Sequence, residues 1–315
     1  MSVIKSYSFP DGEIRGDMFF IQHNNETFSL IDCYLKPQGT TNGRIQEILP
    51  EIQKESADRI CRFISTHPDN DHIAGIESLN AVWPITNFYS VPNNIPGEKG
   101  NESLAKYIEL RDSEHNFSIK RGISRAWLND SAEGRNGGGI NFLWPILENE
   151  KFKEAQAAIL NGGKVNNICP IFTYSLQGGA TVMWMGDLET EMQQEFYERF
   201  SSQIPHVDIL FQPHHGRDTG AVPENLLNAL NPSLIIIGNA PAKYIDYGDS
   251  RQTITQNTSG DLVFALEGRK VHIYTQHSIS NKPVCLKYDY DFAFGNNFQK
   301  TTLLGCRYRG TLTIE

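Results

Sequence analysis

The sequence has no long hydrophobic run. Its 315 residues contain no stretch of about eighteen consecutive apolar residues, the length that spans a bilayer as a helix. Residues 1–7 also lack the apolar core of a secretory signal. We therefore expect no membrane span and no membrane partner, and we expect a cytoplasmic location.

Cysteines are few, and none of them form a C-x-x-C pair. An odd number without paired spacing does not fit a disulfide framework. We expect reduced, mostly buried thiols, as in a cytosolic protein. The five cysteines are Cys33, Cys61, Cys169, Cys285 and Cys306.

Positive charge is also scarce. Lys and Arg number 28 against 37 Asp and Glu, so the net charge is −9. This balance argues against a broad, non-specific surface for nucleic acid. It leaves open a narrow site in which metal ions supply the positive charge.

Two common catalytic motifs are missing. No Gly-x-Ser-x-Gly elbow occurs, so a serine hydrolase has little support. The glycine run 137–139 is not followed by Gly-Lys-Ser/Thr, so we do not interpret it as a phosphate-binding loop.

Apolar patterns predict short strands separated by helices. Such an alternation suggests sheets covered by helices, although periodicity alone does not distinguish one sheet from two. Pro50 either begins or kinks the first predicted helix. Predicted helices cover 43–58 and 102–111, with others after 72, after 187 and from 223. Predicted strands cover 19–21, 28–31, 60–65, 85–91, 140–145, 171–176, 181–185, 207–211, 234–237, 262–266 and 271–274, and the last thirty residues suggest an edge hairpin.

The densest group of potential metal ligands lies in the stretch 66–75, which reads THPDNDHIAG. A β-like apolar run precedes it, and apolar residues at helical spacing follow it. A turn between strand and helix can aim its side chains at one point, where imidazoles and carboxylates lose hydration at a cost unless a cation lies between them. The alternative is a polar loop with an Asp helix cap. The four candidate ligands are His67, Asp69, Asp71 and His72.

Two further stretches place candidate ligands at strand ends. Asp187 follows the predicted hairpin 171–185, and His214-His215 follows the predicted strand 207–211. Each stretch is followed by a helix or a polar turn, as the first one is.

These three stretches resemble the motifs of the metallo-β-lactamase superfamily. The usual signature is His-x-His-x-Asp-His, and here Asp69 replaces the second histidine. The resulting His-x-Asp-x-Asp-His is similar to the ComEC-like competence hydrolase domains. Gly-Asp at 186–187 and His-His-Gly at 214–216 follow in the same order as in that family. The resemblance implies a four-layer αββα sandwich, and since composition shows no break, we expect one domain over 1–315 with two similar halves.

The resemblance also implies a site for two metal ions. His67 and Asp69 would bind the first ion, Asp71 and His72 the second, and Asp187 would bridge them. One histidine of the pair His214-His215 would complete the second site, and the other would contact the substrate or donate a proton; which does which stays open. Asn167 matches a family asparagine in position, which suggests a contact to substrate.

One family ligand has no counterpart here. His115 is the only histidine between His72 and Asp187, and its polar surroundings favour exposure. The first site would therefore be richer in oxygen ligands than the same site in zinc β-lactamases. We expect two divalent ions, Mn²⁺ or Zn²⁺, and the oxygen ligands favour Mn²⁺. His23, His206, His272 and His277 lie in predicted strands or close to their ends and are expected to be structural.

The expected function is a metal-dependent hydrolase of phosphodiester bonds, either a nuclease or a cyclic-nucleotide phosphodiesterase. Metal-bound water loses a proton near neutral pH and provides the nucleophile. Asp71, His214 and His215 are the expected catalytic residues. Two alternatives remain: a hydrolase of a lactone, thioester or β-lactam, and a non-catalytic metal-binding partner protein.

Overall fold

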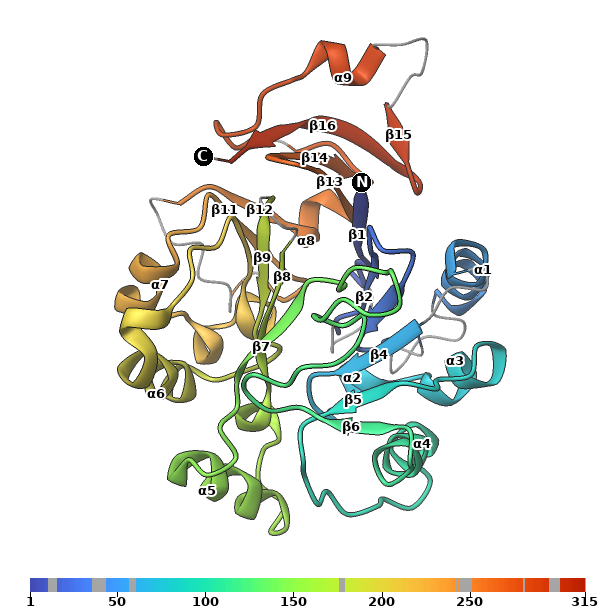
Figure 1. The fold of residues 1–315 in the computed structure, drawn as a ribbon, viewed down its shortest axis with the longest axis vertical. Coiled ribbons are helices and arrows are strands. Elements are labelled where there is room, and N and C mark those ends of the chain that lie inside the picture. The colour runs from blue at the N-terminus through green and yellow to red at the C-terminus, as the bar shows by residue number, and fades with distance from the viewer. Residues whose placement is uncertain are drawn as a thin grey trace.

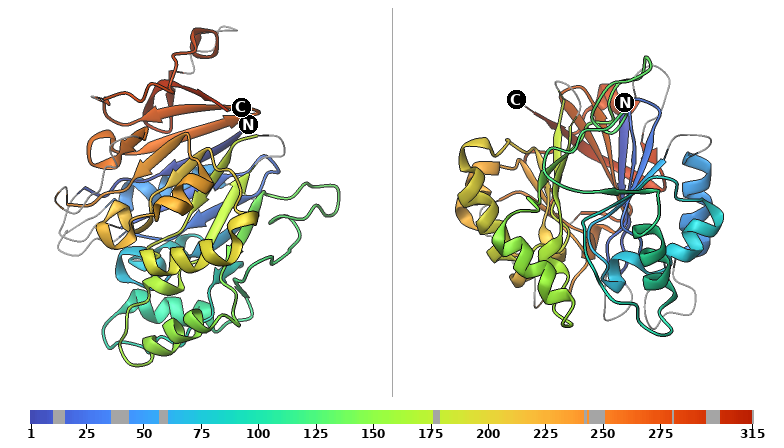
Figure 2. Two further views of the ribbon diagram at one scale, coloured as in Figure 1. Left: turned by 90° about the vertical axis from the view of Figure 1, so that its left-hand side faces the viewer. Right: turned by 60° about the horizontal axis from the view of Figure 1, so that its bottom comes forward.

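The computed structural model describes residues 1–10, 16–35, 44–56, 61–175, 179–241, 243, 251–279, 281–294 and 301–314. All statements below about what is present or absent refer to these residues. Two β-sheets lie face to face, with helices on both outer faces (Figures 1 and 2). This is the four-layer αββα arrangement expected from the sequence.

The larger sheet contains ten strands in the described residues and is mostly antiparallel at one end and parallel at the other. Its strands β3 and β4 run parallel, so their carboxyl ends meet at one edge. In order across the sheet the strands are β15 (Thr302–Leu303), β16 (Cys306–Thr313), β14 (Lys270–Thr275), β13 (Leu262–Glu267), β1 (Ser2–Ser6), β2 (Phe19–Gln22), β3 (Phe28–Ile31), β4 (Cys61–Ser65), β5 (Phe88–Ser90) and β6 (Asn116–Ser118).

The smaller sheet contains six strands in the described residues. Its strands β9 and β10 are also parallel, and their carboxyl ends face the same end of the molecule as those of β3 and β4. In order the strands are β12 (Thr253–Thr255), β11 (Leu234–Ile237), β10 (Ile209–Phe211), β9 (Thr181–Trp184), β8 (Ile171–Ser175) and β7 (Ile140–Trp144).

Helices cover the two outer faces separately. The first group lies against the larger sheet and the second against the smaller one (Figure 2). Two short helices, α8 (Gln256–Ser259) and α9 (Tyr290–Phe294), lie in the last third of the chain. The first group is α1 (Ile45–Ser56), α2 (Asn70–Ile73), α3 (Ile76–Val82) and α4 (Glu102–Arg111), and the second is α5 (Glu150–Ile159), α6 (Thr190–Phe200) and α7 (Glu224–Leu230).

The strands of the larger sheet are apolar on both faces because both faces are covered. Phe19 and Ile21 of β2 belong to the core between the two sheets, whereas Phe20 belongs to the core beneath α1, α3 and α4. Leu30 and Ile31 of β3 divide in the same way. This period of two fixes the register of each strand, and therefore fixes which residues emerge at the strand ends.

Most predicted elements are present, but strands β1, β6 and β12 and helices α5, α8 and α9 had no predicted counterpart. The predicted helix 43–58 is α1, and Pro50 lies inside it rather than at its first turn. The helix expected after the ligand-rich turn is broken into α2 and α3 by Gly75, which has a left-handed φ of 91°. The helix α5 was not predicted, because its apolar residues are few and its exposed face is charged.

No helix in the described part of the chain combines the length and apolar character that a membrane span requires.

Candidate metal centre

The seven predicted metal ligands lie together, in the space outside the carboxyl ends of β4, β9 and β10. Four of them follow β4, Asp187 follows β9, and His214 and His215 follow β10. The Nε2 atom of His72 lies 3.1 Å from Oδ1 of Asp187, and Nε2 of His214 lies 3.6 Å from Oδ2 of Asp187. Three segments far apart in sequence therefore deliver their polar side chains to one point.

Close backbone packing holds the β4 and β9 loops together. Gly186 precedes Asp187 and has a left-handed φ of 52°, and a Cβ atom there would lie 2.8 Å from Cβ of Thr66. The carbonyl of Gly186 accepts a hydrogen bond of 3.0 Å from the backbone N–H of His214. Glycine is required here because any side chain would separate the loops that carry the ligands.

His214 and His215 both have left-handed backbones, with φ of 51° and 55°. Two consecutive residues of this kind cost roughly 1–3 kcal/mol each, which the surrounding structure must offset. They lie in the 3₁₀ turn η3 (Pro213–Gly216), and the next turn, η4 (Asp218–Gly220), packs against it. A Cβ atom at Gly220 would lie 2.5 Å from Cβ of His214, so the absence of a side chain there gives the first imidazole its place. The strained turn directs both imidazoles into the cluster.

Asp187 divides the cluster into two positions. Its Oδ2 atom faces His67 at 4.0 Å and His214 at 3.6 Å, and Asp69 lies 3.8 Å from His67. We call this group (His67, Asp69, His214 and Asp187 Oδ2) the outer position.

The other oxygen of Asp187 defines a second group. Oδ1 faces His72 at 3.1 Å and His215 at 3.5 Å, and Asp71 lies 3.6 Å from His215. We call this group (Asp71, His72, His215 and Asp187 Oδ1) the inner position. His215 is therefore the histidine of the pair that joins Asp71 and His72, and His214 joins His67 and Asp69.

The four imidazoles are oriented by hydrogen bonds on their outward-facing nitrogen. Each Nδ1 atom has a partner outside the cluster, and this arrangement turns each Nε2 atom inward. The partners are Thr66 Oγ1 for His67 at 3.0 Å, Asp32 for His72 at 2.8 Å, Thr219 Oγ1 for His214 at 2.7 Å and Asp17 for His215 at 3.2 Å.

Several polar atoms in the centre of the cluster are buried without a hydrogen bond among the described residues. They are Nε2 of His67, His72 and His215, and Oδ1 of Asp187. The contacts of these imidazole nitrogens with Asp187, at 3.1 to 4.0 Å, are not hydrogen bonds. Ligands about 2.0 Å from a tetrahedral metal lie about 3.3 Å from each other, so the spacing fits divalent cations between these atoms. Such orphaned donors and acceptors are costly unless a cation satisfies them.

The pKa values of the histidines differ according to their neighbours. Burial and the charge of His72 lower the pKa of His67 to about 3, and burial also lowers the pKa of His214. Burial acts in the same direction on His72 and His215, but carboxylates outweigh it and hold both pKa values well above the usual range. In the absence of metal, protons on these two imidazoles take the place of cations.

The carboxylates show the same balance. Burial and neighbouring Asp71 raise the pKa of Asp69 to about 6. Burial alone would raise the pKa of Asp187 too, but His215 and His72 hold it well below the usual range. The cluster contains an excess of acidic groups, and this excess requires positive charge.

Asn167 is placed beside the cluster, but its amide already has a partner. Its Nδ2 atom donates to Glu189 Oε2 at 3.1 Å, and its Oδ1 atom accepts from the Glu189 backbone N–H at 3.3 Å. Glu189 follows Asp187 by two residues, so Asn167 braces the start of α6. A contact between Asn167 and substrate stays a prediction.

The remaining histidines lie outside the cluster. His115 is exposed, as expected. His23 is buried between Gly138, at 2.8 Å, and Ser29, at 2.7 Å, far in sequence from any ligand. His272 is buried and stacks on Phe292.

Sequence reasoning missed the four residues that orient the imidazoles: Asp17, Asp32, Thr66 and Thr219. Asp17 lies two residues before β2, and Asp32 directly follows β3. The sequence holds a usable signal for both, since β2 and β3 are antiparallel neighbours and residues just outside that end of the pair meet the end of β4. Thr219 has no such signal, because only the η3 turn brings it to His214.

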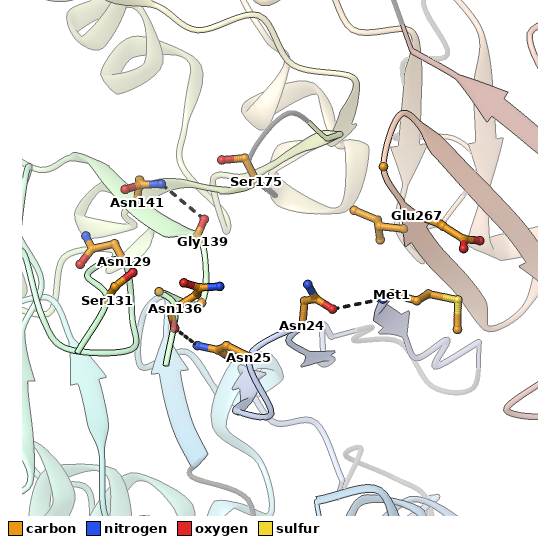
Figure 3. Close-up of a pocket in the computed structure, with 14 residues that line it drawn as sticks. Met1, Asn24, Asn25, Asn129, Ser131, Asn136, Gly139, Asn141, Ser175 and Glu267 are labelled. Atoms are coloured by element: carbon orange, nitrogen blue, oxygen red, sulfur yellow. Dashed lines mark hydrogen bonds between the residues drawn. The ribbon is translucent and has the colours of Figure 1, made fainter. Parts of the chain in front are cut away.

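A second polar region lies at the other end of the sheets (Figure 3). This cavity of about 590 Å³ is bordered by the β2–β3 turn and by Ser175, which pairs with Thr181 at the start of β9, opposite Asp187. It contains no residue of the cluster. Its lining includes Asn24, Asn25, Asn129, Asn136 and Asn141 and the glycines 137–139.

Comparison with known proteins gives only remote likenesses. No family model and no curated protein matches the sequence. Solved structures that match include CmlA, a diiron β-hydroxylase from Streptomyces venezuelae, with 13% identity and a TM-score of 0.42, covering 79% of this chain and 48% of that one. A long form RNase Z from yeast matches with 12% identity and a TM-score of 0.44, covering 81% of this chain and 40% of that one.

The hydrolase AbOPH of the beta lactamase superfamily matches with 13% identity and a TM-score of 0.33, covering 56% of this chain and 59% of that one. The chain thus spans less than half the length of two of these structures, CmlA and the RNase Z. At such low identities and TM-scores, the likenesses assign neither a family nor an activity to the chain.

Proposed function

We propose that the chain is a metal-dependent hydrolase that holds two divalent cations and cleaves phosphodiester bonds. The observation that carries the metal-binding part is the convergence of buried Nε2 and Oδ1 atoms without hydrogen bonds on the two oxygens of Asp187. The phosphodiester part rests on the resemblance of the ligand motifs to the ComEC-like domains.

The outer position would hold one cation through His67, Asp69 and His214, and the inner position the other through Asp71, His72 and His215. Asp187 would give one oxygen to each. Both histidines of the pair are therefore proposed as ligands, in place of one ligand and one proton donor. The mixture of imidazole and carboxylate donors suits Zn²⁺ and Mn²⁺, and the oxygen-rich set favours Mn²⁺.

Bound divalent cations would lower the pKa of water and neutralise the charge of a phosphodiester. The protein supplies the remaining requirements. Asp187 offsets the repulsion between two cations, and the outer position lies open to solvent because Asp69 is 51% exposed. A substrate would therefore approach from the side of Asp69.

The test begins with metal-free protein. Samples reloaded with Mn²⁺ or Zn²⁺ are assayed on single-stranded DNA, a cyclic dinucleotide and a chromogenic β-lactam, with metal per chain counted in parallel. We expect two metals per chain and cleavage of at least one phosphodiester, faster with Mn²⁺.

Each other outcome has a distinct meaning. Cleavage of the lactam with both phosphodiesters intact would overturn the substrate class and leave a metal-dependent hydrolase. Two bound metals with no turnover of any substrate would favour a non-catalytic metal-binding protein. A chain that binds no metal would overturn the proposal as a whole.

A further inference from the structure

The two halves of the cluster differ in what supports their imidazoles. His214 and His215 are consecutive residues in the same strained turn, yet their Nδ1 partners differ in kind. Nδ1 of His215 bonds to the carboxylate of Asp17 at 3.2 Å, and Nδ1 of His214 bonds to the hydroxyl of Thr219 at 2.7 Å. A carboxylate behind an imidazole strengthens it as a metal ligand more than a neutral hydroxyl does, because it stabilises the positive charge that the ring gains.

The same difference recurs in the other pair of imidazoles. His72 of the inner position bonds directly to Asp32 at 2.8 Å. His67 of the outer position meets only the hydroxyl of Thr66, which in turn donates to Asp32 at 2.6 Å. Asp32 therefore acts on His72 directly and on His67 through an intervening hydroxyl.

Exposure separates the two positions at Asp69, independently of these hydrogen bonds. His72 and His215 of the inner position are fully buried, and Asp71 is 15% exposed. In the outer position, His67 is also fully buried and His214 is 13% exposed, but Asp69 is 51% exposed. Ordering an exposed aspartate around a cation costs side-chain entropy, and water competes for the cation there.

Asp17 is held in place for its role. Its backbone N–H donates to the carbonyl of Asp71 at 3.2 Å, and Gly238 packs against both His215 and Asp17 Oδ1. Asp17 thus belongs to the same rigid unit as two inner ligands. One ligand atom each of Asp17, His72, Asp187 and His215 lies within 4.8 Å of the others.

We infer that the two metal positions are unequal: the inner position binds its cation tightly, and the outer position binds a cation weakly and exchanges it. At the η3 turn, Asp17 is the positioning residue that makes His215 a stronger metal ligand than His214. This inference rests on the proposed two-metal function and deepens it, because it names the cation that is open to exchange and to substrate.

The test is a metal titration of the full chain with Zn²⁺ and with Mn²⁺, in competition with a chelating indicator and with metal counted after dialysis. We expect two binding steps, of which only the tighter survives dialysis. Asp69→Asn should leave the tighter step unchanged, and Asp71→Asn should abolish it. This pair assigns each step to its position without reference to activity.

Asp17→Asn and Thr219→Val form a matched pair at the two neighbouring histidines. Asp17→Asn should weaken the tighter step about 10–100-fold, the usual effect of losing a partner behind a metal ligand, and leave the weaker step unchanged. Thr219→Val should affect only the weaker step, and Thr219→Ser should restore it. Thermal unfolding of the metal-free variants identifies any that fail to fold.

Equal affinity of the two positions would overturn the inference, as would the loss of the same step in Asp17→Asn and Thr219→Val. A chain that binds no second metal would also overturn it. The proposed function fails separately: two unequal steps without cleavage of any phosphodiester would refute the function alone, and two equal steps with cleavage would refute the inference alone.

Discussion

The molecule buries two groups of charged side chains, and they differ in whether they are electrically complete. One lies between β1, α1 and the start of β13, where Lys5 is only 2% exposed. Lys5 Nζ lies 2.7 Å from Glu51 and 3.6 Å from Asp261, and Arg44 makes two hydrogen bonds to Asp261, of 2.5 and 2.8 Å. Tyr7 also donates to Glu51 at 2.7 Å. Arg44 also pairs with the exposed Glu47. We call Lys5, Tyr7, Arg44, Glu51 and Asp261 the closed cluster, because each of its carboxylates pairs with Lys5 or Arg44.

The metal cluster has the opposite character. Aspartates 17, 32, 69, 71 and 187 surround imidazoles, and no Lys or Arg pairs with any of them among the described residues. Its central atoms lack hydrogen bonds, whereas none of the charged atoms of the closed cluster is orphaned. Both groups contain buried charged side chains, so burial alone does not identify a functional site. The feature that identifies the functional site is the missing positive charge.

The largest expected effect comes from removing one carboxylate charge from each group. Asp187→Asn preserves shape but removes the anion shared by the two positions, so we expect loss of at least one metal. Activity should fall at least about a thousandfold, which corresponds to about 4 kcal/mol. The fold should survive, because asparagine preserves the shape of the buried side chain.

Asp261→Asn is the matched control in the closed cluster. It leaves Arg44 and Lys5 short of a partner in a buried place, so unfolding free energy should fall by about 3 kcal/mol. Metal content and activity per folded molecule should stay at the wild-type level. If Asp187→Asn kept both metals and full turnover, Asp187 would be only a residue at the start of α6, and the contrast between the clusters would collapse.

The second prediction concerns metal and stability. Saturating Mn²⁺ or Zn²⁺ should raise the free energy of unfolding of the wild type by about 2.7 kcal/mol for each bound cation whose dissociation constant lies about a hundredfold below the free metal concentration. Asp261→Asn should gain the same increment from its lower starting point, since its metal cluster is intact. Chemical denaturation with and without a chelator measures both increments. A metal increment of the same size in Asp187→Asn would show that metal binds elsewhere.

The two clusters were not equally visible in the sequence. Ligands His67 to His72 are close in sequence and follow one strand, so a local pattern predicted them. The closed cluster joins residues 5, 51 and 261, which only the pairing of β1 with β13 brings together, and no local pattern contains that information. The same applies to Thr219 and to the division of ligands by Asp187, which depend on the left-handed turn at His214 and His215. Apolar patterns predicted the strands and the covering helices, but the four-layer arrangement was expected only from the resemblance of the motifs, because periodicity does not distinguish one sheet from two.

A third, smaller effect separates the metal histidines from a structural one. Burial and nearby Arg62 lower the pKa of His23 to about 3, from 6.5. The folded protein keeps His23 neutral while the unfolded chain takes up a proton below pH 6.5. Its contribution to stability is therefore complete above that pH and is lost as pH falls toward about 3.

His23→Gln retains one donor and one acceptor but does not titrate. Between pH 6.5 and about 3, the stability of metal-free wild type should fall more steeply than that of the variant, by up to about 1.4 kcal/mol per pH unit. The difference between the two denaturation curves isolates His23, because all other groups are shared. Parallel curves would mean that His23 is charged in the folded protein, as His72 and His215 are in the absence of metal.

The smallest expected effect lies at the edge of the metal cluster, at Asn167. Its amide shares Glu189 with Lys164, whose Nζ lies 2.8 Å from Glu189 Oε1. If Asn167 also contacts the substrate, Asn167→Ala should raise KM up to about tenfold, or about 1.4 kcal/mol, while kcat and metal content hold. Lys164→Ala frees the other Glu189 oxygen, Oε1, without touching the amide bound to Oε2, so it reports what loosening Glu189 does by itself. A KM that rises equally in both variants would assign the effect to Glu189 and the start of α6, and a KM that rises in neither would make Asn167 a structural brace. A rise confined to Asn167→Ala would extend the metal cluster by one substrate contact, on the exposed side where Asp69 lies.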